Sequence, residues 1–250
     1  MVVKTVIVPS QPALLLQGSS RSVIISDLHI GFESKLVSND IFLGKNTTTD
    51  ETINEIESII DSTKADSLIL LGDIKSSIKS ISKSEWNDVP KFLKKMKDRV
   101  DTVLIPGNHD ANIQKLVPDG ISLGSSVGMV LENILLTHGH TIPSENFSHV
   151  DKIIMGHVHP VFFQEGSVLN GQRVWVSIKT EKHQIFPSVS GELEIIIVPS
   201  FNRYFYATQK KFYKKSISPI LEKIKKYSSV KIVTLDGTII GDESIINQVL

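Results

Sequence analysis

Short apolar runs and segments with helical periodicity alternate along the first two-thirds of the chain, and this alternation restricts the fold more than any other feature. The runs at residues 22–26, 67–71 and 102–105 have the length of buried strands. Between them, isoleucines share one face of a predicted helix at residues 50–61, and residues 85–100 predict a second helix with a lysine-rich outer face. Strands that alternate with helices predict a parallel sheet with right-handed crossovers.

After Gly120 the pattern changes to strands with few helices. We expect a hairpin at residues 128–137 and further strands at 152–155, 173–178 and 193–198. A helix at 219–227 and a hairpin turning at Asp236-Gly237 follow. The chain is therefore predicted to have an α/β (α+β) fold, with two mixed β-sheets packed face to face in a sandwich flanked by helices, a four-layer αββα arrangement.

Histidine is concentrated where strands end. Of 8 histidines, six lie in four short clusters that directly follow apolar runs. The clusters are Asp27-Leu28-His29, Asn108-His109-Asp110, His138-Gly139-His140 and Gly156-His157-Val158-His159. Asp73, after Gly72, has the same kind of position. Loops at the carboxyl ends of strands line the ligand crevice of open α/β sheets, so we expect these five loops to meet at one site.

The chemistry of these residues indicates a pair of metal ions. The chain has no cysteine, so the site offers carboxylate, imidazole and amide oxygen without thiolate, a set that suits Mn²⁺, Fe²⁺ or Zn²⁺. One carboxylate can bridge two ions roughly 3.5–4 Å apart, and such a pair clamps the attacking and leaving oxygens of a phosphoryl displacement. Gly-Asn-His-Asp is the most specific motif, whereas His149 and His183 are interpreted as structural histidines.

Taken in order, the motifs resemble those of the calcineurin-like metallophosphoesterases: D-x-H, G-D, G-N-H-[DE], H-G and G-H-x-H. All five occur between Asp27 and His159. The opening of the chain and its ending, with SPIL and LDGTIIG, look like small archaeal phosphoesterases related to the nucleases Mre11 and SbcD. The resemblance implies a metal-dependent phosphoric ester hydrolase that acts on phosphodiester or phosphomonoester bonds. It also implies a catalytic domain at residues 1–200, on which a basic C-terminal extension at 201–250 would pack.

The resemblance also implies roles for individual residues. One metal would take Asp27, His29 and His159, and the other Asn108, His138 and His157. Asp73 would bridge two divalent ions, for which we expect manganese, with iron, zinc, nickel and cobalt as alternatives. A water between the ions would attack phosphorus, with His109 as the acid and Asp110 orienting it. His140 would lie behind the ligands or face the substrate. The charge of Lys75, and not the resemblance, indicates either a contact with a substrate phosphate or an exposed loop lysine.

Two alternatives remain open. One is a nuclease that acts on DNA or RNA. Against Mre11-type action, Ser76 stands where those nucleases carry a histidine three residues after the Gly-Asp aspartate. The other is a non-catalytic, metal-stabilised scaffold, which would have no need of His109.

A net charge of zero conceals an uneven distribution. Residues 201–231 hold nine lysines and arginines against one acid, Glu222, so the rest of the chain carries a charge of minus eight. Aromatic residues are interleaved with these basic residues, which is typical of a single-stranded nucleic acid surface or of a solvated face. No apolar run is long enough to span a bilayer, and we expect a cytoplasmic enzyme. The family resemblance also favours a homodimer.

Overall fold

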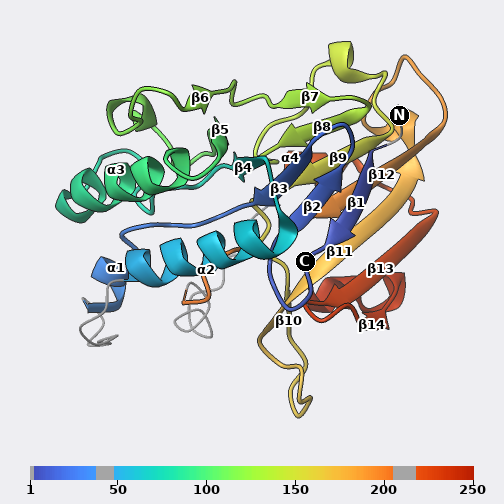
Figure 1. Ribbon diagram of the computed structural model, residues 1–250. Coiled ribbons are helices and arrows are strands. Elements are labelled where there is room, and N and C mark those ends of the chain that lie inside the picture. Colours follow the sequence, from blue (N-terminus) through green and yellow to red (C-terminus); the bar gives the residue numbers. More distant parts are fainter. Residues whose placement is uncertain (1–2, 38–47, 205–217) are drawn as a thin grey trace.

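The computed structural model describes residues 3–37, 48–204 and 218–250, which build two sheets that face each other (Figure 1). The first sheet has the strand order β1-β2-β3-β4-β5-β6. Its strands are β1 (Lys4–Ile7), β2 (Leu14–Gln17), β3 (Arg21–Ile25), β4 (Ser67–Leu71), β5 (Asp101–Ile105) and β6 (Ser122–Leu123). The strands from β3 to β6 are parallel, whereas β1 and β2 are antiparallel additions to one edge. Because β3, β4 and β5 run in the same direction, their carboxyl ends lie next to one another at the same end of the sheet.

The second sheet has the order β14-β13-β11-β12-β9-β8-β7, and β10 also pairs with β11. Its strands are β7 (Met129–Leu131), β8 (Ile134–Thr137), β9 (Lys152–Met155), β10 (Val161–Phe162), β11 (Gln172–Glu181), β12 (Glu192–Ile197), β13 (Ser229–Thr234) and β14 (Ile239–Gly241). β8, β9 and β12 are parallel, and the other pairs are antiparallel. The C-terminal hairpin is part of this sheet, because β13 pairs with β11 along its length. The division of the chain at residue 200 stays a prediction.

Helices cover the outer faces of both sheets. The α-helices are α1 (Glu33–Val37), α2 (Thr48–Thr63), α3 (Lys83–Lys97) and α4 (Pro219–Lys223), and short 3₁₀ helices lie at Ile113–Lys115, Glu145–Phe147, Lys182–Gln184 and Glu243–Gln248. α2 and α3 lie side by side on the first sheet (Figure 1). α4 ends before the predicted Tyr227, because the side chain of Gln184 accepts hydrogen bonds from the backbone amides of Lys225 and Lys226. None of the helices in the described ranges is long and apolar enough to cross a membrane.

Three apolar layers hold the sandwich together. Leu14, Ile24 and Ile69 of the first sheet pack against Ile154 and Trp175 of the second, which forms the central layer. The opposite side chains of the first sheet pack under α2 and α3, as Val23, Ile56 and Phe92 illustrate. A third cluster lies on the outer face of the second sheet, with Ile220 of α4 and Ile246 of the last 3₁₀ helix. Two mixed sheets with helices outside are the fold that the sequence predicts, and that prediction is confirmed.

Candidate metal centre

The five histidine and aspartate loops leave strands of both sheets and meet. In the first sheet, β3 is followed by the loop with Asp27 and His29, β4 by the loop with Asp73, and β5 by the loop with Asn108 and His109. The loops with His138 and with His157 and His159 follow β8 and β9 of the second sheet. The loops hydrogen-bond to one another. The His157 amide of the second sheet donates to the Asp27 carboxylate of the first at 3.1 Å, and within the second sheet the Gly156 amide donates to the His138 carbonyl at 3.1 Å.

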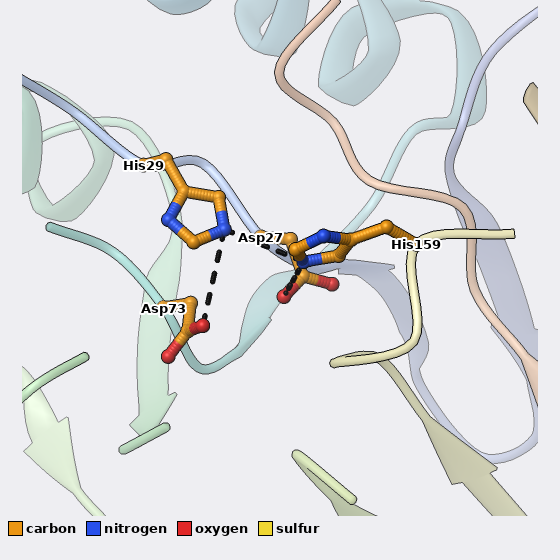
Figure 2. A group of neighbouring side chains, drawn as sticks. All are labelled: Asp27, His29, Asp73 and His159. Atoms are coloured by element: carbon orange, nitrogen blue, oxygen red, sulfur yellow. Dashed lines mark hydrogen bonds and ion pairs between the residues drawn. The ribbon is translucent and has the colours of Figure 1, made fainter. Parts of the chain in front are cut away.

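The side chains form two groups of donor atoms that share one carboxylate. Asp27, His29, Asp73 and His159 form the first donor group, and Asp73, His138 and His157 form the second. Within each group the ligating atoms lie within 4.8 Å of one another. Figure 2 shows how the side chains of the first donor group converge. The Oδ1 atom of Asn108 lies 3.2 Å from the Nε2 atom of His138, so the Asn108 amide adjoins the second group.

Left-handed backbone turns bring these side chains together. The φ angles are +59° at Asp27, +46° at His29, +52° at Asp73, +70° at His157 and +51° at His159. A left-handed conformation costs a residue other than glycine about 1–2 kcal/mol, so the surroundings must stabilise it. The Asp27 amide donates to the Gly72 carbonyl at 3.1 Å, and the His29 amide to the Asp73 carbonyl at 2.9 Å. The first two loops therefore brace each other.

Both carboxylates of the first donor group are almost completely buried and ionised. Burial opposes the charge of Asp27, but attraction to His159 and His138 lowers its pKa to about 2. For Asp73, burial is likewise outweighed by His138, His29 and His109, which hold its pKa well below the usual value. Burial would lower the pKa of His138, but the charges of Asp73 and Asp27 raise it to about 10. The two carboxylates thus attract a positive charge to a buried position, as cation ligands do.

Most of the other imidazoles are held in the neutral form in which they can bind a metal. Burial lowers the pKa of His29 to about 3. Burial and the neighbouring His138 lower the pKa of His157 to about 4. The Nδ1 atom of His138 lies 2.7 Å from the Leu71 carbonyl, which can only accept, so this nitrogen donates and the Nε2 atom faces Asp73. Such a contact behind a ligand fixes the tautomer and the orientation of the ring.

His109 is oriented by a backbone carbonyl and not by Asp110, so that expectation is wrong. The His109 Nδ1 atom lies 2.6 Å from the Ser76 carbonyl and must donate to it, which leaves the Nε2 atom 3.9 Å from an oxygen of Asp73. The Asp110 carboxylate instead accepts from the amides of Gly107 at 2.8 Å and Ile74 at 2.9 Å. Burial and the charge of Asp73 raise the pKa of Asp110 to about 6. Asp110 thus holds the backbone around Asp73.

Lys75 and His140 are the remaining residues for which the sequence predicts a role at the site. The expectation that Lys75 contacts substrate or is exposed is wrong, because its side chain is buried and its ammonium donates to the carbonyls of Ser77 and Ser80. It therefore supports the loop before α3. His140 is half-buried, with its ring centroid 5.2 Å from that of His138 and 6.1 Å from that of His157. It lies beside the second donor group without belonging to it.

Gly107 leaves no room for a side chain next to the shared carboxylate. A Cβ atom there would overlap the Asp73 carboxylate and lie 2.5 Å from the Asp73 amide nitrogen. We expect Gly107→Ala to displace Asp73 and to lower metal affinity by at least about tenfold, the lower end for changes behind metal ligands. Titration with Mn²⁺ measures this. Gly124→Ala is the matched control, because its Cβ atom would have ordinary contacts of 3.5 Å. Unchanged metal binding in Gly107→Ala would show that the shared carboxylate tolerates displacement.

A buried cluster of histidines and carboxylates at the ends of strands could hold divalent ions, and such ions activate water in metal-dependent hydrolases. The model of the calcineurin-like phosphoesterase family matches residues 20–175. The chain therefore belongs to the calcineurin-like phosphoesterases, and it is a hydrolase of phosphate esters with a divalent-metal site.

One solved structure supports this fold, and a second is reported beside it. The crystal structure of the Pseudomonas putida nuclease MPE is similar with a TM-score of 0.51 and 17% identity, over 94% of this chain and 98% of that one. YfcE, a phosphoesterase from E. coli, has a TM-score of 0.40 and 17% identity, over 90% of this chain and 98% of its own. No curated protein matches the sequence. At these identities the first similarity supports the fold alone.

Proposed function

We propose that the chain is a dinuclear phosphoesterase in which Asp73 bridges two divalent ions. The observation that carries this proposal is the membership of Asp73 in both donor groups. Asp27, His29 and His159 would complete one site, and Asn108, His138 and His157 the other. We propose manganese as the metal, since oxygen and nitrogen donors without thiolate suit it; iron, zinc, nickel and cobalt are the alternatives. A cytoplasmic location and a homodimer stay predictions.

The residues fit such ions chemically. The buried carboxylates of Asp27 and Asp73 need positive charge, and the His29 and His159 Nε2 atoms lie only 3.3 Å apart, where they can share a ligand. Bound ions would supply an activated water nucleophile and would neutralise charge on the phosphoryl group. The remaining chemistry is left to the side chains around them.

His109 is the side chain best placed to act on the substrate. Its side chain is 16% exposed, whereas those of His29 and His138 are completely buried. The Ser76 carbonyl holds the proton of Nδ1, so Nε2 is the nitrogen that faces the site. We propose that protonated His109 donates a proton from Nε2 to the leaving oxygen, a role typical of a positioned imidazole. Asp73 also accepts from the His109 amide at 2.8 Å, which fixes the distance between this residue and the shared carboxylate.

The test is hydrolysis of bis-p-nitrophenyl phosphate by metal-stripped protein to which Mn²⁺ is returned. We expect no turnover in the stripped protein and recovery of activity as the second ion binds. Comparison with p-nitrophenyl phosphate separates diesterase from monoesterase action. Protein that binds a pair of ions but hydrolyses neither ester with any divalent metal would favour the scaffold, which the presence of His109 argues against.

Nuclease action is the second candidate and uses the same chemistry. The observation that favours it is the excess of positive charge at residues 201–231, of which 205–217 lie outside the described residues. Cleavage of labelled DNA and RNA tests it. The matched variant replaces Lys210, Lys211, Lys214 and Lys215 with alanine. Nuclease action predicts that this variant loses cleavage of nucleic acid and keeps hydrolysis of the nitrophenyl ester. Equal cleavage by both proteins would remove the basic segment from the argument.

A further inference from the structure

Residues 26–29, called the metal loop below, contain Asp27 and His29. Three consecutive carbonyls of this loop accept hydrogen bonds from residues 200–202, which are far away in the sequence. The Ser26 carbonyl accepts from the Phe201 amide at 2.8 Å, and the Asp27 carbonyl accepts from the Ser200 hydroxyl at 2.9 Å. The Leu28 carbonyl accepts from the Asn202 side-chain amide at 2.9 Å. The Asn202 backbone amide adds a longer contact of 3.3 Å to the Asp27 carbonyl. Residues 200–202 thus supply a hydrogen-bond donor to each of the three carbonyls of residues 26–28.

This segment is itself fixed in place. The Ser200 side chain is completely buried, and Phe201 is buried in the apolar cluster below α2. A guanidinium nitrogen of Arg173, on β11, donates to the carbonyls of Ser200 at 2.8 Å and Phe201 at 2.9 Å. Arg173 therefore binds the carbonyls of Ser200 and Phe201, while the donors of residues 200–202 point toward the loop of residues 26–28.

The metal loop needs such support because both of its ligand residues have left-handed backbones. Its amides are held by the carbonyls of Gly72 and Asp73, which belong to the motif set. Its carbonyls are held by residues 200–202, which lie beyond the family match at 20–175. Without those donors, only the backbone amides of the metal loop would be hydrogen-bonded, and its carbonyls would lose the partners that help to keep Asp27 and His29 directed at the first donor group.

We propose that residues 200–202 are a positioning segment of the metal centre: they hold the loop of residues 26–29 so that Asp27 and His29 face the first donor group. This inference rests on the proposed pair of ions and concerns one of them. The family motifs are then insufficient for full affinity, and the chain after residue 175 completes the site.

The test compares Ser200→Ala and Asn202→Ala with the wild type in Mn²⁺ titrations by calorimetry. We expect the affinity of one of the two ions to fall by about 10- to 100-fold, as is typical when a contact behind a ligand is removed, while the other ion binds as before. Thr180→Val is the matched control, because it removes a buried hydroxyl that donates to the Lys226 carbonyl at 2.8 Å in the second sheet. It should leave both ions unaffected.

Double variants identify which ion is weakened. Ser200→Ala should weaken the ion that remains in Asn108→Ala, and should have no further effect on the ion that remains in Asp27→Asn. Equal weakening of both ions, or none, would overturn the proposal. A second measurement needs no metal: hydrogen exchange of the amides of residues 27–30 in metal-free protein should accelerate in both variants and not in Thr180→Val. If the wild type does not bind a pair of ions, the proposed function fails, and this exchange still decides whether residues 200–202 hold the loop.

Discussion

Asp73→Asn should abolish hydrolysis and weaken both metal ions together. The Asp73 Oδ1 atom lies 3.3 Å from the His138 Nε2 atom, and the Oδ2 atom lies 3.8 Å from the His29 Nε2 atom, so one carboxylate serves both donor groups. An amide keeps the shape but loses the charge and one acceptor. We expect each ion to bind more than about 100-fold more weakly, beyond the range for changes behind a ligand. Metal content after dialysis, measured by atomic emission, checks this result.

Asp27→Asn is the matched control for that experiment. Asp27 belongs to the first donor group alone, so this variant should lose one ion and keep the other. The melting temperature in EDTA should show that both proteins are folded. Retention of one full ion by Asp73→Asn would contradict a bridging role. It would then assign Asp73 to a single site.

His109→Ala should lower kcat for an alkyl phosphate ester by about 10²- to 10⁴-fold and leave the metal content unchanged. The side chain belongs to neither donor group, and its Nδ1 contact is with the Ser76 carbonyl, so its removal opens no ligand position. Steady-state kinetics and metal analysis of the same preparation check both halves of the prediction.

The leaving group distinguishes proton donation from stabilisation of charge on the phosphoryl group. A poor leaving group, such as an alkoxide, needs a proton in the transition state, whereas a nitrophenolate needs little help. As an acid, His109 should therefore matter far more for alkyl esters than for nitrophenyl esters. The same loss for both would indicate that His109 stabilises the charge of the transferring group. A full rate of His109→Ala with the alkyl ester as well would exclude His109 from the mechanism.

The sequence predicted the parts of the fold where periodicity is strong. β4 begins and ends where its apolar run does, and α2 buries the predicted isoleucines. The N-terminal strands β1 and β2 were not predicted. The side chains of β1 are mostly half-buried, so they show no clear alternation. β6 and β10 are only two residues long, too short for any pattern.

At the site, the sequence predicted which side chains gather but not every contact that holds them. A pattern of residue types can place His109 near Asp73, but it cannot show that the Ser76 backbone carbonyl, rather than the neighbouring Asp110, orients the ring. The charge of Lys75 predicts a position in solvent or against substrate, yet the following loop folds over the side chain and supplies carbonyls for its ammonium. Backbone acceptors carry no signature in a sequence, and both errors arise from them.

The donor groups draw on both sheets, and this has a consequence for stability and biogenesis. Asp27 and Asp73 follow strands of the first sheet, while His138 and His159 follow strands of the second. A bound ion would therefore act as a cross-link between the two halves of the sandwich. A ligand at 100 times its Kd stabilises the native state by about 2.7 kcal/mol, so the melting temperature should rise with free metal concentration. During synthesis, the first donor group cannot assemble before His159 has left the ribosome, so all strands of the first sheet, β1 to β6, are synthesised before this group can capture a metal ion.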